Sequence, residues 1–451
     1  MGTEMHNGWK WMVAAALLAG AQFAHAILPI EHWQTASGAK VYFVANRGLP
    51  MLDVSVDFPA GYGYDTSEKS GVAAMTNGLL QLGAGGLGED EIARRLADIG
   101  AIMGERFEAD RAGLSLRTLS DVARRTQALD IFSRVLRAPD FSAAVLEREK
   151  QRLTAALKES DLKPDTQVSR LFYRLIYREH PYALRSSGDV DTVSRIGRDD
   201  LLAFYRRHYT ASQAVIAIMG DVTRAEAEAI SEQIARGLPR TDGAAPVLPR
   251  VEPLAGGITR IVAHPAAQSH ILIGAPGIRR DDPDYFPVFV GNHILGGGGF
   301  TSRITEEVRQ KRGLAYSAYS YFSPLQVRGP FVIGMQTRRD QADEALAVVR
   351  KTLNDFVRDG PTEQELQAAR QNIIGGFPMR IDSNRKIHGY LALIGFYGLP
   401  ISYLEDFVAN VERVTAADIK SAFARRVDPE KLVTVVVGAD RDQTLSEQGR
   451  R

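Results

Sequence analysis

The sequence predicts an α+β fold of two duplicated domains, each with helices packed on a mainly antiparallel sheet. Three observations lead to this prediction. The chain has 451 residues, which suits two or three domains of about 100–200 residues each. A helix–turn–strand pattern that begins at Asp200 returns at Asp418. Runs with alternating hydrophobicity also follow runs of helical periodicity, which is typical of helices layered on a sheet.

The first predicted element is a secretory signal peptide over residues 1–26. Lys10 precedes an apolar run, and the residues Ala24, His25 and Ala26 fit the small-x-small pattern of a signal peptidase site. The run is shorter than the roughly 20 residues that a membrane-spanning helix needs. We therefore expect cleavage before Ile27 and an exported protein, periplasmic or secreted, with no membrane span after cleavage. An uncleaved N-terminal anchor is the alternative.

The two domains are expected over residues 27–238 and 258–445. Alternating runs over residues 54–58, 113–119 and 331–335 predict strands, and helical periodicity over residues 145–157 predicts a helix. Residues 239–257 are rich in Pro and Gly and have little periodicity, which is typical of a linker. Two domains joined in this way could form half of a clamshell-like chamber.

Composition excludes several classes of function. Lys and Arg number 55 against 54 Asp and Glu, so no strong basic field would attract nucleic acid. The absence of Cys excludes disulfides, thiolate zinc sites and iron–sulfur clusters. No G-x-S-x-G, H-E-x-x-H or H-x-x-E-H motif occurs, and the glycine run at residues 296–299 lacks the G-K-S/T of a phosphate-binding loop.

Three segments in order resemble one family of peptidases. They are LPMLDVSVDFPAGYGYDTSEKSGVAAMTNGLLQLG from Leu49, HPYALRSSGDVDTV from His180, and LGGGGFTSRITEEVRQKRGLAYSAYSYF from Leu295. Together they resemble the inverzincin peptidases, which include pitrilysin, insulin-degrading enzyme, and the mitochondrial and bacterial processing peptidases. The resemblance spans nearly the whole mature chain, and the segment from Leu295 is the most specific.

The resemblance also shows what this chain has lost. The family's zinc helix carries H-x-x-E-H, but the two His positions hold Ala74 and Gly78 here, and the position of the general-base Glu holds Asn77. The family's distal Glu ligand falls at Ala156. An amide cannot take a proton from water at neutral pH, and catalytic zinc needs three protein ligands. We therefore expect no zinc or other cofactor on this chain.

The second domain keeps the residues with which the family grips substrate, namely Arg309 and Tyr316. We expect Arg309 on the last turns of a helix and Tyr316 on a strand, on the same face as Ala318 and Ser320. A guanidinium and a phenol there would donate hydrogen bonds to a peptide carbonyl or to the oxyanion formed from it. The alternative is a solvated helix charge and a core aromatic residue. Two residues of the glycine run, Gly297 and Gly298, are also expected to contact substrate.

In the family's heterodimeric members, one subunit carries zinc and the other carries the Arg and Tyr. The resemblance therefore implies the non-zinc subunit of an exported heterodimeric zinc endopeptidase, inactive alone, with zinc on a homologous partner. Its substrate would be a peptide or unfolded polypeptide. The alternative is a catalytically dead peptide-binding or scaffold protein, as in the core proteins of the respiratory bc1 complex, which resemble the same family.

Overall fold

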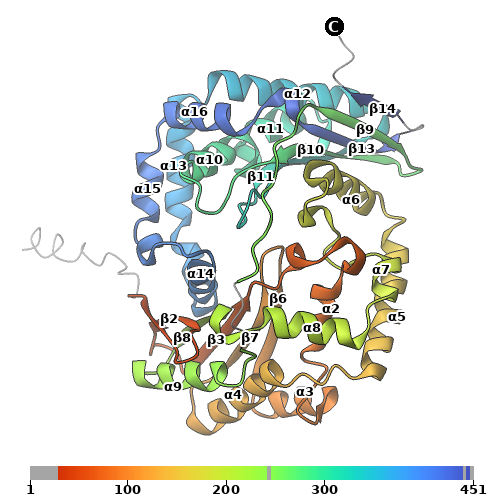
Figure 1. Ribbon diagram of the computed structural model, residues 1–451. Helices are drawn as coiled ribbons and strands as arrows, with labels where there is room; N and C mark the ends of the chain where they lie inside the picture. Colours follow the sequence, from red (N-terminus) through yellow and green to blue (C-terminus); the bar gives the residue numbers. More distant parts are fainter. Residues whose placement is uncertain (1–28, 241–244, 440–442, 447–451) are drawn as a thin grey trace, which may run out of the picture.

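The computed structural model describes residues 29–240, 245–439 and 443–446. These residues form two six-stranded sheets, one in each half of the chain, and Figure 1 shows the N-terminal half below the C-terminal half. The predicted signal peptide at residues 1–26 lies outside the described residues. Across the described ranges, no helix combines the length and hydrophobicity needed to cross a membrane.

The N-terminal sheet uses strands from the first half of the chain. Its order is β1 (Glu31–Gln34), β2 (Lys40–Ala45), β8 (Val215–Gly220), β3 (Met51–Phe58), β7 (Ala112–Leu119) and β6 (Ile102–Phe107). The helices of this half are α2 (Val72–Leu79), α3 (Glu89–Asp98), α4 (Val122–Arg137), α5 (Ala143–Ser160), α6 (Pro164–Tyr177), α7 (Val190–Ser194), α8 (Arg198–His208) and α9 (Arg224–Ala235). A small separate sheet pairs β4 (Gly83–Ala84) with β5 (Leu87–Gly88).

The C-terminal sheet has the same strand order with one rearrangement. Its order is β11 (Ala315–Phe322), β12 (Pro330–Arg338), β10 (Gln268–Pro276), β13 (Val433–Ala439), β9 (Ile258–Ala263) and β14 (Gln443–Ser446). The helices are α10 (Tyr285–Asn292), α11 (Arg303–Thr305), α12 (Ala342–Asp359), α13 (Glu363–Gly376), α14 (Asn384–Tyr397), α15 (Phe407–Arg413) and α16 (Ala416–Arg426).

The two sheets are copies of one pattern. Each contains one parallel pair, β2 with β8 and β9 with β13, among antiparallel neighbours. The edge strand beside β2 precedes it in the chain, whereas the strand beside β9 comes from the end of the chain. The predicted α+β fold of two duplicated, mainly antiparallel layers is therefore confirmed.

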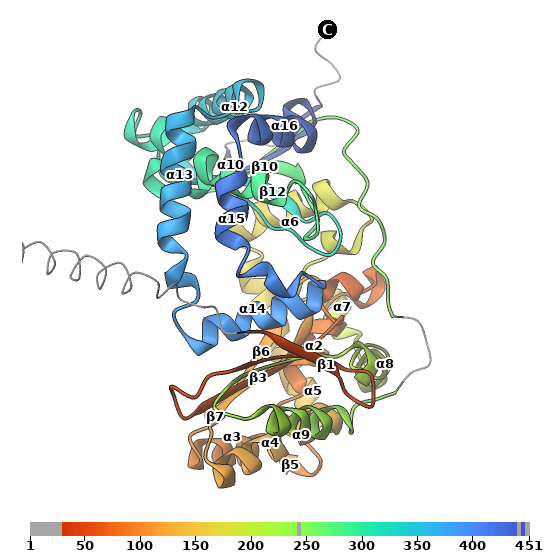
Figure 2. The same cartoon turned by 90° about the vertical axis from the view of Figure 1, so that its left-hand side faces the viewer.

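Each half lends one helix to the sheet of the other half. Helix α6 packs on β10 and β13 of the C-terminal sheet, and α14 packs on β8, β3 and β2 of the N-terminal sheet. Figure 2 shows α14 lying across the N-terminal sheet, with α3, α4 and α9 on its opposite side. Apolar residues of the predicted linker, Leu248, Val251 and Leu254, join the cluster that α6 forms with the C-terminal sheet. The halves are therefore interlocked rather than simply tethered.

The packing of α14 on the N-terminal sheet explains why both faces of β3 are buried. The residues Leu52, Val54, Val56 and Phe58 alternate into the N-terminal core, as the period-2 pattern predicts. The intervening Asp53, Ser55 and Asp57 are buried as well. They lie on the face that α14 covers, so both faces of this strand are shielded from water. Their charges are matched by arginines: Asp53 pairs with Arg117 at 2.6 Å and Asp57 with Arg111 at 3.2 Å.

Asp110 ties the halves together at the turn between β6 and β7. Its carboxylate is fully buried and accepts hydrogen bonds from the Tyr182 hydroxyl, the Tyr397 hydroxyl at 2.8 Å and the Gln326 backbone N–H at 2.7 Å. Tyr397 and Gln326 come from the C-terminal half. Burial raises the pKa of Asp110, and these three donors counteract that effect by stabilising the carboxylate.

We expect Asp110→Ala to lower the free energy of unfolding by about 3 kcal/mol or more, because it leaves several buried donors without an acceptor. Urea unfolding would measure the change. The control is Asp130→Ala, which removes an exposed helical carboxylate that pairs with Arg134 at 3.3 Å and should cost less than about 1 kcal/mol. Similar losses in the two variants would contradict the proposed role of Asp110 in joining the halves.

Candidate functional site

Helix α2 contains Ala74, Asn77 and Gly78, the residues that the resemblance aligns with the family's zinc helix. Its first turn is held by Asp65, whose carboxylate accepts hydrogen bonds from the backbone N–H groups of Gly71 at 2.7 Å and Ala73 at 2.9 Å. Burial raises the pKa of Asp65 to about 7, although both hydrogen bonds favour the charged form. Gly71 has φ +96°, and a Cβ there would lie 2.9 Å from the Ser187 carbonyl oxygen, so the start of α2 requires glycine.

The positions of the zinc ligands offer nothing to a metal ion. Ala74 and Gly78 lie half-buried on α2, and Ala156 is exposed on α5. A Cβ added at Gly78 would meet no atom within 4 Å, so no neighbouring group occupies that position. Among the described residues, no group of three or more His, Asp or Glu side chains could hold a metal ion. The residues present therefore do not fit zinc.

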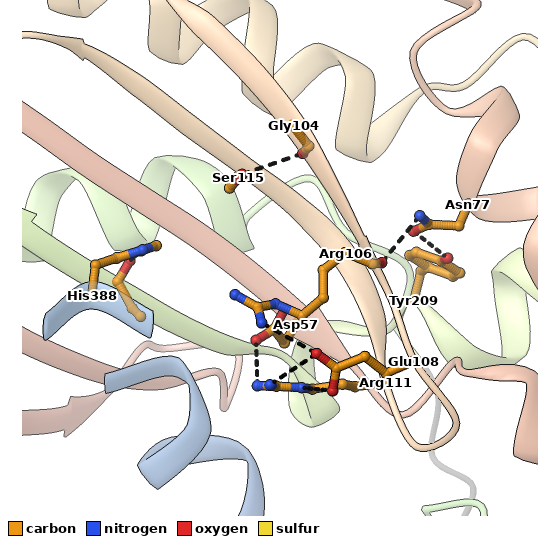
Figure 3. Close-up of polar contacts among 10 residues, drawn as sticks. Asp57, Asn77, Gly104, Arg106, Glu108, Arg111, Ser115, Tyr209 and His388 are labelled. Atoms are coloured by element: carbon orange, nitrogen blue, oxygen red, sulfur yellow. Dashed lines mark hydrogen bonds and ion pairs between the residues drawn. The ribbon is translucent and has the colours of Figure 1, made fainter. Parts of the chain in front are cut away.

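Asn77, at the general-base position, has a structural role instead. Its side chain is 1% exposed. Its amide nitrogen donates to the backbone carbonyl of Arg106 at 3.2 Å, and its amide oxygen accepts from the Tyr209 hydroxyl at 3.1 Å (Figure 3). Asn77 thus connects α2 to the edge strand β6 and to Tyr209, which directly follows α8. An amide can donate and accept at once, whereas a carboxylate could not donate to the Arg106 carbonyl.

A cluster of charged side chains also holds strand β6 in place. Asp57 of β3 pairs with Arg106 of β6 at 3.1 Å and with Arg111 at 3.2 Å, and Glu108 pairs with Arg111 at 3.0 Å (Figure 3). Glu108 and Arg111 lie in the turn between β6 and β7. The Arg111 guanidinium also lies 5.6 Å from the Phe396 ring centre on α14. These side chains are paired with one another, so the cluster serves to fix the β6–β7 hairpin beneath α14.

Arg309 and Tyr316 meet on the C-terminal half. Arg309 lies on the π-helical turn Glu306–Gln310, which the buried residues Ile304 and Val308 fix to the core. Tyr316 lies on β11. The guanidinium carbon of Arg309 is 4.4 Å from the Tyr316 ring centre, within the range of a cation–π contact. The tyrosine is 82% exposed, so the alternative of a core aromatic residue is wrong.

Tyr316 does not share a face with Ala318 and Ser320, contrary to the sequence prediction. Ala318 and Ser320 are buried, whereas Tyr316 is exposed. The pairing of β11 with β12 shifts register between Ala315 and Ser317, which marks a β-bulge. The extra residue breaks the alternation and turns the Tyr316 ring outward toward Arg309.

Phe300 is a third member of this site, which the sequence analysis missed. Its ring centre lies 4.7 Å from the Arg309 guanidinium carbon, and the Gln310 side chain donates to its backbone carbonyl at 2.6 Å. The ring is 64% exposed. An aromatic residue directly after a glycine run was the available signal. We call Phe300, Arg309 and Tyr316 the Arg309 cluster.

Of the four cations between residues 303 and 312, Arg309 forms no ion pair with a described residue. Arg303 pairs with Glu365 at 2.6 Å, and both Lys311 and Arg312 pair with Glu307, at 2.7 Å and 2.6 Å. Within the described parts of the chain, no carboxylate or carbonyl accepts a hydrogen bond from the Arg309 guanidinium. Its N–H groups are therefore available to an acceptor from outside the chain.

Gly297 and Gly298 lie just before Phe300 and are tightly packed. A Cβ at Gly297 would lie 2.7 Å from the Asn292 amide nitrogen, and one at Gly298 would lie 2.6 Å from the His293 carbonyl oxygen. The π-helical turn His293–Gly297 and the approach to Phe300 therefore require small residues. Their contact with substrate stays a prediction.

We expect Asn77→Asp to destabilise the fold by about 1–3 kcal/mol at pH 8, because it places a carboxylate against the Arg106 carbonyl. Burial should raise the pKa of this new carboxyl in the folded state, so the loss should shrink as the pH falls and the group becomes protonated. Urea unfolding at pH 8 and pH 5 would measure both effects. Tyr209→Phe removes one hydrogen bond to the same amide without adding charge, and its cost should not depend on pH in this range.

Comparison with known proteins agrees with these observations. Residues 41–189 match the family model described as insulinase (peptidase family M16), and residues 195–373 match the model described as the peptidase M16 inactive domain. A crystal structure described as a peptidase M16 inactive domain, from Pseudomonas fluorescens, is 38% identical with a TM-score of 0.87. The match covers 91% of this chain and 98% of that one.

Two curated relatives are also similar to most of the chain. A Helicobacter pylori protein named non-peptidase homolog YmxG is 23% identical over 88% of this chain and 91% of its own length. An uncharacterized zinc protease of Streptomyces coelicolor is 27% identical over 71% of this chain and 70% of its own length. The chain belongs to the M16 peptidase family, as an inactive homologue of its zinc proteases.

Proposed function

We propose that this chain is the non-zinc subunit of an exported heterodimeric zinc endopeptidase. The observation that carries the proposal is the unpaired guanidinium of Arg309, held beside the exposed phenol of Tyr316 while the neighbouring cations are neutralised. The contacts with the Phe300 and Tyr316 rings hold the guanidinium in place and leave its N–H groups available to an acceptor on a ligand.

In this proposal the two subunits divide the work. A homologous partner supplies zinc and the general base, and substrate lies in a chamber between the subunits. Arg309 and Tyr316 donate hydrogen bonds to the substrate backbone and to the oxyanion formed at the scissile carbonyl. Phe300 covers the bound peptide beside them, and the turn at Gly297 and Gly298 contacts the substrate backbone. The substrate is a peptide or an unfolded polypeptide, because such contacts require an extended backbone.

Arg309→Gln should lower kcat/KM of the reconstituted heterodimer by about 10²–10³-fold, the cost typical of losing one oxyanion donor. Purified alone, this chain should cleave no peptide. The partner is sought as a co-purifying, zinc-containing M16 protein, and cleavage of a quenched fluorescent peptide is the assay.

The matched control is Arg312→Gln, which removes a cation from the same segment that Glu307 already neutralises. It should leave kcat/KM within about twofold, as expected for an exposed ion pair. Full activity of the partner without this chain, or an unchanged rate with Arg309→Gln, would overturn the proposal. Either result would favour the alternative of a catalytically dead peptide-binding or scaffold protein.

The export part of the proposal has its own test. Expressed from its full gene in a Gram-negative host, the protein should be recovered from the periplasm or medium, and mass spectrometry should give Ile27 as the first residue. An intact N-terminus in the membrane fraction would show instead that residues 1–26 act as an anchor.

A further inference from the structure

Arg280 is a half-buried cation that no carboxylate of the described chain neutralises, although three aspartates follow it directly. It lies between β10 and α10, in the sequence RRDDPD over residues 279–284. Each of these aspartates pairs with another arginine, namely Asp281 with Arg279 at 2.6 Å, Asp282 with Arg426 at 2.8 Å and Asp284 with Arg425 at 2.7 Å. The positive charge of Arg280 is therefore left over in a segment rich in carboxylates.

Aromatic rings hold the Arg280 side chain in place. Its guanidinium carbon lies 5.2 Å from the Tyr397 ring centre and 6.0 Å from the Tyr285 ring centre, within the range of cation–π contacts. Its backbone N–H donates to the Leu325 carbonyl at 2.8 Å. Among the described residues, no acceptor bonds to the guanidinium, and its Nε atom is buried without a partner. The guanidinium is thus fixed in position with its terminal N–H groups free.

The tyrosine hydroxyls near Arg280 supply a further donor and no counter-ion. The Tyr403 hydroxyl donates to the Tyr285 hydroxyl at 3.2 Å, so the Tyr285 hydrogen remains available to a ligand. The Tyr285 ring stacks on the Phe289 ring at a centre distance of 6.1 Å, which fixes its position. Burial raises the pKa of Tyr403, so its phenol is neutral at pH 7 and leaves the Arg280 charge uncompensated.

Arg111 offers a comparison on the same tyrosine ring. Its guanidinium carbon lies 5.8 Å from the Tyr397 ring centre, a distance similar to that of Arg280. Arg111, however, pairs with Asp57 at 3.2 Å and with Glu108 at 3.0 Å. Two arginines therefore contact one ring, and only Arg111 is neutralised by the described chain. A contact with Tyr397 does not by itself prevent an arginine from having a carboxylate partner.

The chemistry of the site favours a carboxylate as its ligand. A planar guanidinium can donate to both oxygens of a carboxylate at once. One uncompensated positive charge matches a single negative charge better than the double charge of a phosphate. The rings of Tyr285 and Tyr397 beside it are suited to an acid with an apolar or aromatic body.

We propose that Arg280 and Tyr285, beside the ring of Tyr397, bind the carboxylate of an organic acid. The carboxylate accepts hydrogen bonds from the terminal N–H groups of Arg280 and from the Tyr285 hydroxyl. Its source is either a free organic acid or the C-terminus of a peptide, which share this chemistry. The site uses neither the Arg309 cluster nor a partner subunit, so it stands or falls separately from the proposed endopeptidase role.

A ligand-observed NMR titration of the full chain with benzoate at pH 7.5 tests this proposal. The parent protein carries Arg309→Gln, so that the exposed arginine of the Arg309 cluster does not contribute. Benzoate should bind with a Kd of about 1–10 mM, and about tenfold or more tighter than its neutral analogue benzamide. Arg280→Gln should remove this preference. Arg280→Lys should keep only part of it, because lysine lacks the planar pair of donors.

Arg279→Gln is the matched control, because Arg279 is the exposed neighbour that Asp281 already neutralises. It should leave the preference for benzoate within about twofold of the parent. Tyr285→Phe should weaken the binding of benzoate but not that of benzamide. Thermal unfolding would establish that every variant is folded.

A second pair of ligands, N-acetylphenylalanine and its C-terminal amide, distinguishes the two sources of the carboxylate. Tighter binding of N-acetylphenylalanine than of benzoate would identify a peptide C-terminus, and the reverse would identify a free organic acid. Equal binding of benzoate and benzamide, no binding of either acid, or equal losses in Arg279→Gln and Arg280→Gln would overturn the proposal. Stronger competition by inorganic phosphate than by acetate would also overturn it.

Discussion

The exchange of α6 and α14 between the halves is the constraint on which the rest of this structure depends. Each helix covers a sheet face that its own half leaves open, so neither half could bury its sheet alone. The buried carboxylate of Asp110 completes the connection, because its donors come from both halves. The same exchange places α14 over the charged face of the N-terminal sheet.

Helix α2, whose sequence resembles the family's zinc helix, is fixed by hydrogen bonds near both of its ends. Asp65 holds the first turn of α2, and Asn77 ties the helix to β6 and to Tyr209 at the end of α8. A buried general base must remain charged and close to water, which costs stability, whereas a buried amide with a donor and an acceptor partner costs little. Asn77 is therefore a structural group at the position where the resemblance predicts the general base.

The distribution of charge separates structural from functional groups. The buried carboxylates of β3 are paired, Asp53 with Arg117, and Asp57 with Arg106 and Arg111. The cations beside Arg309 are paired as well. The Arg309 guanidinium has no such partner among the described residues, so an acceptor from outside the chain can bind it.

The sequence by itself determined the duplicated α+β fold, since hydrophobic periodicity and the repeat are local and depend only on residue order. It also determined the absence of zinc ligands at Ala74, Gly78 and Ala156, because a side chain without a donor atom cannot bind metal in any fold. Only the tertiary structure decided the helix exchange, the burial of both faces of β3, the outward turn of Tyr316 and the position of Phe300 beside Arg309. These features arise from contacts between distant segments and from a β-bulge, and neither leaves a periodic signal in the chain.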